Sequence, residues 1–120
     1  MGMTLDHARK LFAAIDAMNA DAFVSFLTPD GEFKFGNNPS VVGQGAIAQL
    51  VDGFWRSIGG SSHTLVHLWN DGDRVALQGE VSYTRKDGKV VTVPFVNVFH
   101  LRGDKIARYL IHIDNTPLFA

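Results

Sequence analysis

Apolar residues recur every three or four positions near the start of the chain. The pattern covers positions 5 to 18, and Thr4 precedes it as a residue that can cap a helix. A second short helix is expected over residues 22–27, with Asp21 as its cap and Pro29 as its stop. The chain therefore begins with helices that each present one apolar face.

A brief strand and a longer helix follow. Phe33 and Phe35 alternate with charged residues, which predicts a strand, and residues 36–40 consist of turn-forming types. Apolar residues then return at helical spacing from Ile47 to Ile58. This is the clearest helical pattern in the chain.

From residue 62 onward the apolar period becomes that of strands separated by short turns. The four predicted strands cover residues 62–69, 74–85, 89–102 and 105–114. Tight turns between consecutive strands indicate antiparallel hairpins. Helices followed by such a sheet predict an α+β fold with the helices packed on one face.

The strand over residues 89–102 is apolar on both of its faces. Phe95 and Phe99 lie on one face, and Val96 and Val98 lie on the other. A strand of a half-solvated sheet should instead alternate apolar and polar residues. Because the helices cover only one face, we expect a second copy of the chain to cover the other, in a homodimer formed through the sheet.

Composition narrows the expected partners and chemistry. The 120 residues carry a net charge of −1 and no cluster of Lys and Arg, so neither nucleic acid nor an anionic membrane is an expected partner. Without cysteine, the chain has no disulfide, no thiolate catalysis and no cysteine-bound zinc. The absence of a signal-peptide or membrane-spanning pattern suggests a cytoplasmic protein, and the length fits one domain over residues 1–120.

The last predicted strand carries two titratable residues inside its apolar run. His112 and Asp114 are two positions apart, so they lie on one face with their Cα atoms roughly 6.5–7 Å apart. In an apolar setting this pair could move a proton between carbon and oxygen. Alternatively, Asp114 bonds the region of Thr116 and His112 is satisfied by backbone groups, which would make both residues structural.

Asn97 stands among apolar residues such as Phe95 and Phe99. A buried amide needs partners, because one unpaired group costs about 1–3 kcal/mol. Asn97 could hydrogen-bond a ligand carbonyl, or it could satisfy a bulge beside Pro94, which cannot complete a strand ladder.

His63 and His67 have the spacing of a helical metal pair, but they fall in a predicted strand. Four residues along a strand span about 13 Å, so one zinc ion cannot reach both imidazoles. We therefore predict no metal site and two ordinary sheet histidines, one of which could line a pocket. Asp16, at the margin of the first apolar stripe, is expected to be solvated. No nucleotide or flavin motif appears, so no cofactor is expected.

Four stretches together carry a resemblance to a known family: NADAF (19–23), VVGQGAIAQL (41–50), WNDGDRVALQGEVSY (69–83) and KIARYLIHIDNTPLF (105–119). Across nearly the whole chain they resemble the SnoaL-like branch of the nuclear transport factor 2-like superfamily. The resemblance implies a cystatin-like α+β roll, a cone-shaped and strongly curved antiparallel sheet wrapped around the N-terminal helices. It also implies an apolar pocket for a small hydrophobic ligand, for which we expect these lining residues: Phe12, Phe33, Phe35, Trp55, Tyr83, Phe95 and Leu110.

The same resemblance bears on catalysis. In ketosteroid isomerases of this fold, the general-base aspartate matches the stretch around Phe35 and Asn37, and the oxyanion tyrosine matches Phe12. The second acid of those enzymes falls near Asn97, so steroid isomerisation is not expected. SnoaL-like cyclases place a catalytic aspartate on the last strand, and Asp114 looks like that residue.

Two kinds of function remain open at this point. The first is acid/base catalysis of cyclisation, isomerisation or dehydration on a small hydrophobic oxygenated substrate. In it, Asp114 and His112 would transfer protons and Asn97 would orient a carbonyl. The alternative is a non-catalytic ligand-binding or dimerisation domain of the same fold.

Overall fold

The computed structural model describes residues 2–120, which form helices and strands in the predicted order. The helices are α1 (Leu5–Asp16), α2 (Ala20–Val24), α3 (Gln44–Arg56) and α4 (Thr116–Phe119). The strands are β1 (Leu27–Phe35), β2 (Val41–Val42), β3 (Gly60–Asp71), β4 (Arg74–Thr84), β5 (Val90–Arg102) and β6 (Lys105–Ile113). Within residues 2–120, no helix is long and apolar enough to span a lipid bilayer.

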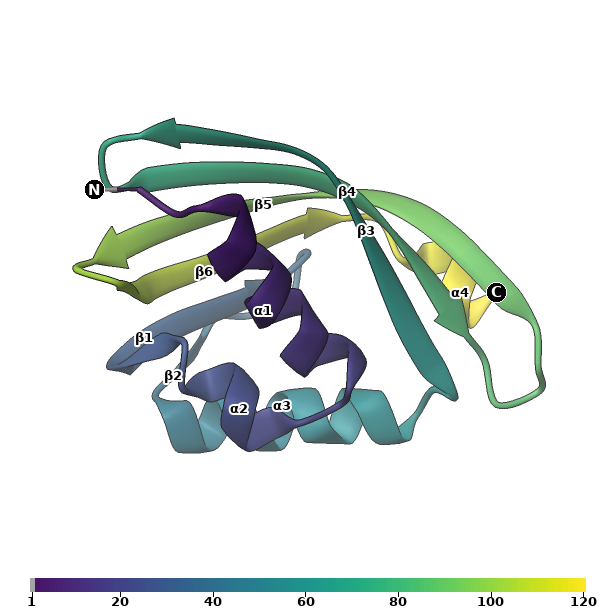
Figure 1. Cartoon of the computed structure of the whole chain (residues 1–120). Helices are drawn as coiled ribbons and strands as arrows, with labels where there is room; N and C mark the ends of the chain where they lie inside the picture. The colour runs from purple at the N-terminus through teal and green to yellow at the C-terminus, as the bar shows by residue number, and fades with distance from the viewer. Residues whose placement is uncertain (1) are drawn as a thin grey trace.

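All six strands belong to one curved, open sheet with the order β2-β1-β6-β5-β4-β3. Every neighbouring pair is antiparallel except β1 and β6, which run parallel. Helices α1, α2 and α3 lie on the concave side of the sheet, and α4 follows β6 near one end of it (Figure 1). The predicted α+β fold with a strongly curved sheet around N-terminal helices is therefore confirmed.

One boundary near the start differs from the prediction. Asn19, rather than Asp21, caps α2, and the helix ends at Val24. The residues expected to complete this helix already belong to β1 or lead into it. Pro29 lies inside β1, in a stretch where the pairing with β6 is irregular, so its missing N–H interrupts no regular ladder.

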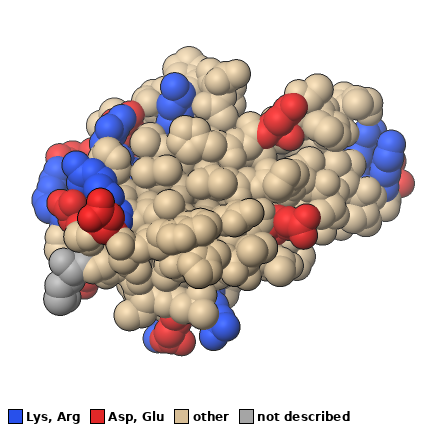
Figure 2. Space-filling model, turned by 90° about the horizontal axis from the view of Figure 1, so that it is seen from above, with Lys and Arg blue, Asp and Glu red and all other residues tan. Residues whose placement is uncertain are grey.

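The two faces of the sheet have different surroundings. On the inner face of β5, residues such as Phe95 and Phe99 are buried against the helices. The outer face of the same sheet exposes large apolar side chains, which are Trp69, Val90 and Val96. Seen from the side of β3, β4 and β5, this surface carries few charged groups over a wide area (Figure 2). Both faces of β5 are thus apolar, and in a single chain the outer one faces solvent.

Helix α1 is fastened to β3 at both of its ends. Before the helix, the Met3 backbone N–H donates to Asn70 Oδ1 at 2.7 Å, and Asn70 Nδ2 donates to the Met3 carbonyl at 3.0 Å. At the other end, Asp16 bonds to His63 and to its neighbour Ser61. These contacts fix the direction in which α1 crosses the concave face.

Gly79 allows the Phe95 ring to lie against the backbone of β4. A Cβ atom at position 79 would come within 2.5 Å of the Thr64 carbonyl oxygen and 2.8 Å of the Phe95 ring. Either the adjacent strand or the ring would have to move to make room. Since Phe95 is an inner-face residue, the absence of a side chain at Gly79 shapes the interior of the cone.

Gly79→Ala is expected to lower the free energy of unfolding by about 1–3 kcal/mol through this overpacking. Gly53→Ala is the matched control, because Gly53 lies within α3 and a Cβ atom there meets no atom within 4 Å. The same substitution should there raise stability by about 0.5–1 kcal/mol through helix propensity. Urea unfolding measures both changes, and similar shifts in the two variants would contradict the packing argument.

Candidate functional site

A cavity of about 340 Å³ lies between the inner face of the sheet and the helices α1 and α3. This volume is at the small end of the range for ligand sites, about 300–1,000 Å³. Six residues that the sequence analysis assigned to a pocket line it: Phe12, Phe33, Phe35, Trp55, Tyr83 and Phe95. Among the described residues that line the cavity there is no lysine or arginine.

The cavity has a mouth at the open end of the cone. Its lining there includes Asn38 from the loop after β1, Leu50 from α3 and Phe119 from α4. All three side chains are exposed, and Phe119 retains 67% of its accessible surface. A small molecule can therefore reach the interior without passing between α1 and the sheet.

Asp16, the last residue of α1, does not itself line the cavity but bonds two residues that do, Ser61 and His63. Its Oδ1 accepts a hydrogen bond from the Ser61 hydroxyl at 2.9 Å and lies 2.5 Å from His63 Nδ1. Its Oδ2 accepts from the backbone N–H of His63 at 2.9 Å. The side chain of Asp16 is only 28% exposed, so the expectation that it is solvated is wrong.

Two opposing effects set the charge of Asp16. Burial raises the pKa of this carboxyl, whereas hydrogen bonds from His63 and Ser61 lower it, and the net pKa lies below the usual value. Asp16 is therefore ionised near neutral pH and can only accept hydrogen bonds. It follows that Nδ1 of His63 carries a proton, and that a neutral His63 has its free lone pair on Nε2.

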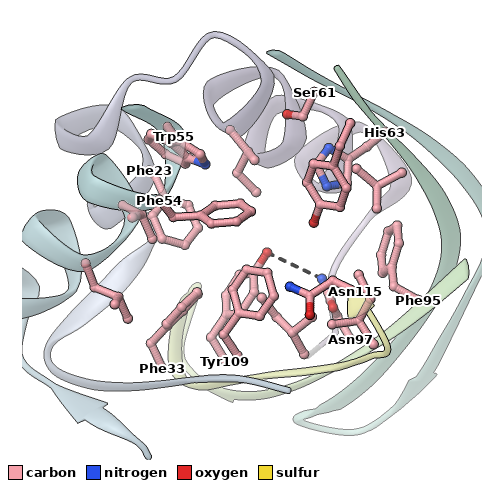
Figure 3. A pocket seen from close by; sticks show the side chains of 18 of the residues that line it. Phe23, Phe33, Phe54, Trp55, Ser61, His63, Phe95, Asn97, Tyr109 and Asn115 are labelled. Carbon is pink, nitrogen blue, oxygen red and sulfur yellow. Dashed lines mark hydrogen bonds between the residues drawn. The ribbon is translucent and has the colours of Figure 1, made fainter. Parts of the chain in front are cut away.

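Aromatic rings hold the His63 imidazole in place. Its ring centroid lies 4.9 Å from that of Phe12 and 5.5 Å from that of Phe95. His63 lines the cavity, and Figure 3 shows it on the same side as Ser61. The imidazole is thus oriented by a carboxylate on one side and by apolar walls on the other, as in a catalytic base.

Two tyrosine hydroxyls complete the polar groups deep in the cavity. Burial raises the pKa of both Tyr83 and Tyr109, and the charge of Asp16 adds to the effect on Tyr83. Both side chains therefore remain protonated near neutral pH. Each can donate a hydrogen bond to an oxygen of a bound molecule.

Asn97 lies on the cavity wall, as expected for a site residue, and is only 2% exposed. Its Nδ2 donates a long hydrogen bond of 3.4 Å to Tyr109 Oη, drawn as a dashed line in Figure 3. Its Oδ1 is buried without a hydrogen-bond partner among the described residues. Pro94 pairs in regular register with Glu80, so Asn97 does not serve a bulge at that proline.

The three remaining predicted site residues, Leu110, His112 and Asp114, do not line the cavity. Residues of a strand alternate between faces, and β6 turns Tyr109, Ile111 and Ile113 inward. Leu110 and His112 therefore point outward, where they pair in register with Val98 and Val96 of β5. The expectation that His112 and Asp114 flank a ligand in the cavity is therefore wrong. The inward positions are Ile111 and Ile113, each one residue before the residue that was expected.

Asp114 has a structural partner instead. Its Oδ1 accepts hydrogen bonds from the Thr116 hydroxyl at 2.6 Å and from the Thr116 backbone N–H at 3.1 Å. These two bonds lower the pKa of the Asp114 carboxyl. The alternative considered for Asp114, a bond to the region of Thr116, is therefore the observed one, and it leads the chain into the unpredicted helix α4.

The sequence analysis missed the pairing of Asp16 with His63. The two residues are 47 positions apart, and no local pattern indicates which helix end meets which strand. The available signal was weak: Asp16 directly follows the apolar Ile15, and His63 shares a strand face with Leu65. Asp16 thus lies next to the apolar face of α1, and His63 lies on the apolar face of β3. These two faces pack together in the fold.

His67 belongs to a different surface. It is exposed, and its ring packs against Trp69 at a centroid distance of 4.4 Å. Within the part of the chain that the structure describes, no three His, Asp or Glu residues gather closely enough to hold a metal ion.

Solved structures with the same fold include proteins of several kinds. TerC, co-crystallised with polyporic acid, is 20% identical, with 96% of this chain and 94% of that chain covered at a TM-score of 0.83. A ketosteroid isomerase-like protein from Catenulispora acidiphila DSM 44928, in complex with trimethylamine, is 17% identical, with 95% and 89% covered at a TM-score of 0.86. An NTF2-like protein of unknown function from Burkholderia pseudomallei K96243 is 15% identical, with 98% and 96% covered at 0.87.

At these identities the structural likeness establishes the fold alone. A search of curated proteins finds no match to this chain. The family model for the SnoaL-like domain, by contrast, matches residues 8–109, which include Asp16, His63, Asn97 and Tyr109. The protein therefore belongs to the SnoaL-like domain family, the group that its sequence resembles.

Proposed function

We propose that this protein catalyses proton transfer on a small, uncharged, oxygenated ring compound, with His63 as the general base and Asp16 as the residue that orients it. The observation that carries the proposal is the hydrogen bond between Asp16 and His63 Nδ1 at the wall of an aromatic cavity. A base held by a partly buried carboxylate, next to a space of ligand size, is the arrangement that proton abstraction requires.

The chemistry follows from the protonation states. Nε2 of His63 takes a proton from a carbon next to a carbonyl, and the electron pair of the broken C–H bond moves toward the carbonyl oxygen. The charge of Asp16 stabilises the imidazolium that forms. Protonated Tyr83 and Tyr109 are available to stabilise the developing oxyanion by hydrogen bonds.

The fate of the enolate distinguishes the possible reactions. Return of the proton to a different carbon is an isomerisation, loss of a hydroxyl group with a proton is a dehydration, and attack on a second carbonyl is a cyclisation. The bound polyporic acid of TerC supports a ring compound as ligand for this fold. The aromatic walls and the lack of lysine or arginine in the described lining favour a neutral one.

The second candidate function is ligand binding without turnover. The cavity supports it directly, because its aromatic lining would hold a small ring whether or not His63 acts as a base. Measuring exchange of a carbon-bound proton separates the two functions, since a binding protein has no reason to accelerate it.

We further propose that the outer face of the sheet pairs with a second copy of the chain. Trp69, Ala76, Val98 and Leu110 lie in one row across β3, β4, β5 and β6, as the strand registers place them. Val96, in the next row, is 37% exposed in the single chain. An exposed apolar row across four strands is more typical of a protein interface than of a solvated sheet.

The catalytic proposal predicts exchange of the C2 protons of 1-indanone for deuterium, followed by NMR in D₂O. His63→Gln is expected to lower the protein-catalysed rate by about 10²–10⁴-fold, because the base is lost while the shape is kept. His112→Gln, on the outer face of the same sheet, should leave the rate unchanged. Full activity in His63→Gln would refute the role of His63, and no acceleration by the wild type would favour the binding function.

The lowered pKa of Asp16 predicts a specific acid sensitivity. A carboxyl with a lower pKa in the folded than in the unfolded chain contributes stability that is complete above its unfolded pKa, near 3.8, and is lost as the pH falls through the folded pKa. The stability difference between wild type and Asp16→Asn should therefore be largest at pH 6–7, as rough bounds, and shrink below about pH 4. Urea unfolding across this range measures it.

Asp6→Asn is the control for that experiment, because Asp6 is on the same helix but is 77% exposed and pairs only with Lys10 among its neighbours on α1. Its effect should be smaller and should vary less with pH. A pH profile of Asp16→Asn parallel to that of the wild type would contradict the ionised, hydrogen-bonded state of Asp16.

The dimer proposal predicts that Val96→Lys converts a dimer to a monomer, because it places a charge directly beside the apolar row of Trp69, Ala76, Val98 and Leu110. Val42→Lys is the matched control, since Val42 is 63% exposed but lies on β2 at the far edge of the sheet. Light scattering coupled to size-exclusion chromatography gives the mass of each variant. A monomeric wild type, or a dimer that survives Val96→Lys, would reject this interface.

A further inference from the structure

The amide of Asn97 has an unused acceptor inside the cavity. Asn97 is 2% exposed, lines the cavity and lies among the apolar side chains of β5. Its Nδ2 is directed to Tyr109, while its Oδ1 is buried without a partner among residues 2–120. A buried carbonyl oxygen that the protein leaves unpaired is available to a donor on a bound molecule.

Tyr109 offers the complementary group, a hydroxyl that can donate a hydrogen bond. Its Oη accepts the hydrogen bond from Asn97, and a hydroxyl group that accepts one bond still has its own proton to donate. The ring is 1% exposed and is held by Phe23, Phe33 and Phe99, whose centroids lie 5.4, 5.3 and 4.6 Å away. The hydroxyl is therefore fixed in position beside the Asn97 amide.

We propose that Asn97 and Tyr109 act as a paired acceptor and donor that selects a ring bearing a hydroxyl group next to a carbonyl group. The ligand hydroxyl donates to Asn97 Oδ1, and the ligand carbonyl accepts from Tyr109 Oη. This assigns Asn97 a role opposite to that of a donor to a carbonyl, because one N–H of its amide already bonds Tyr109 and its Oδ1 is the buried atom left without a partner among residues 2–120. The inference rests on the proposed function, because both treat the cavity as a ligand site.

This selection fits the position of the base. Figure 3 shows His63 and Ser61 on one side of the cavity and Asn97 and Tyr109 on the other. A ring held by its oxygens against Asn97 and Tyr109 leaves free the C–H bond of its hydroxyl-bearing carbon, which stands out of the ring plane and can point toward His63. In a hydroxy ketone, the C–H of the hydroxyl-bearing carbon is next to the carbonyl and is therefore acidic. Its removal by His63 gives an enediol once the carbonyl oxygen is protonated.

Four indane derivatives test the proposal by isothermal titration calorimetry on the wild-type protein. They are 2-hydroxy-1-indanone, 1-indanone without the hydroxyl, 2-indanol without the carbonyl, and indane without either. We expect 2-hydroxy-1-indanone to bind at least about tenfold more tightly than 1-indanone or 2-indanol, because each lacks a partner for one buried group. Equal affinity for the hydroxy ketone and 1-indanone would overturn the proposal.

Variants assign the preference to individual residues. Asn97→Leu should abolish the preference for the hydroxyl group but keep that for the carbonyl, and Tyr109→Phe should do the reverse. Gln49→Leu, which replaces an exposed amide of α3 outside the cavity lining, should leave both preferences unchanged. If Asn97→Leu weakened 1-indanone and the hydroxy ketone alike, Asn97 would be a donor to the carbonyl and the proposed pairing would be wrong.

Proton exchange is measured separately from ligand affinity, so that the two proposals can fail independently. A preference for the hydroxyl without any proton exchange supports the Asn97–Tyr109 pair and rejects the catalytic function. Exchange at normal rates without the preference rejects the pair alone. Failure of all four compounds to bind at millimolar concentration rejects the cavity as a site for such rings, and with it the inference. Since the comparison of ligands uses the wild-type protein, the test does not depend on the folding of any variant.

Discussion

Both the architecture and the candidate site depend on the hydrogen bonds that the Asp16 carboxylate accepts from β3. Asp16 ends α1, reaches β3 through His63 and Ser61, and so determines how the helix crosses the concave face. The same oxygens require a proton on Nδ1 of His63. A half-buried charge is tolerated next to aromatic walls only because these donors compensate its desolvation. Geometry and protonation at the site are therefore two results of one contact.

The aromatic rings add rigidity where a cavity would otherwise collapse. Tyr109 contacts three other rings, and His63 lies between Phe12 and Phe95. Large rings packed edge to face leave gaps that flexible aliphatic chains would fill. The polar groups of the site are thus attached to rings that other rings contact on several sides. Such support from surrounding side chains is what a preorganised site requires.

The sequence was informative about the fold and less so about the site, for identifiable reasons. Runs of strand-forming residues separated by short turns indicated the sheet, and helical spacing indicated α1 and α3. The last strand was ambiguous, because both of its faces are apolar. Only the position of the helices decides that Tyr109 faces inward and His112 outward. The Asp16–His63 contact joins segments 47 residues apart, and such a contact leaves no periodic trace.

The attachment of α1 to β3 at both ends limits the routes by which a ligand could enter and leave the cavity. Opening the cavity on the side of α1 would require the helix to leave β3, which would break the contact that orients the imidazole. A gate at this position would therefore release the His63 imidazole from its orienting carboxylate each time it opened. The mouth beside Phe119 involves none of these bonds. Under the proposed function, exchange of ligands through the open end of the cone would leave the Asp16–His63 contact intact between turnovers, so a fixed helix and an open entrance are compatible in one small domain.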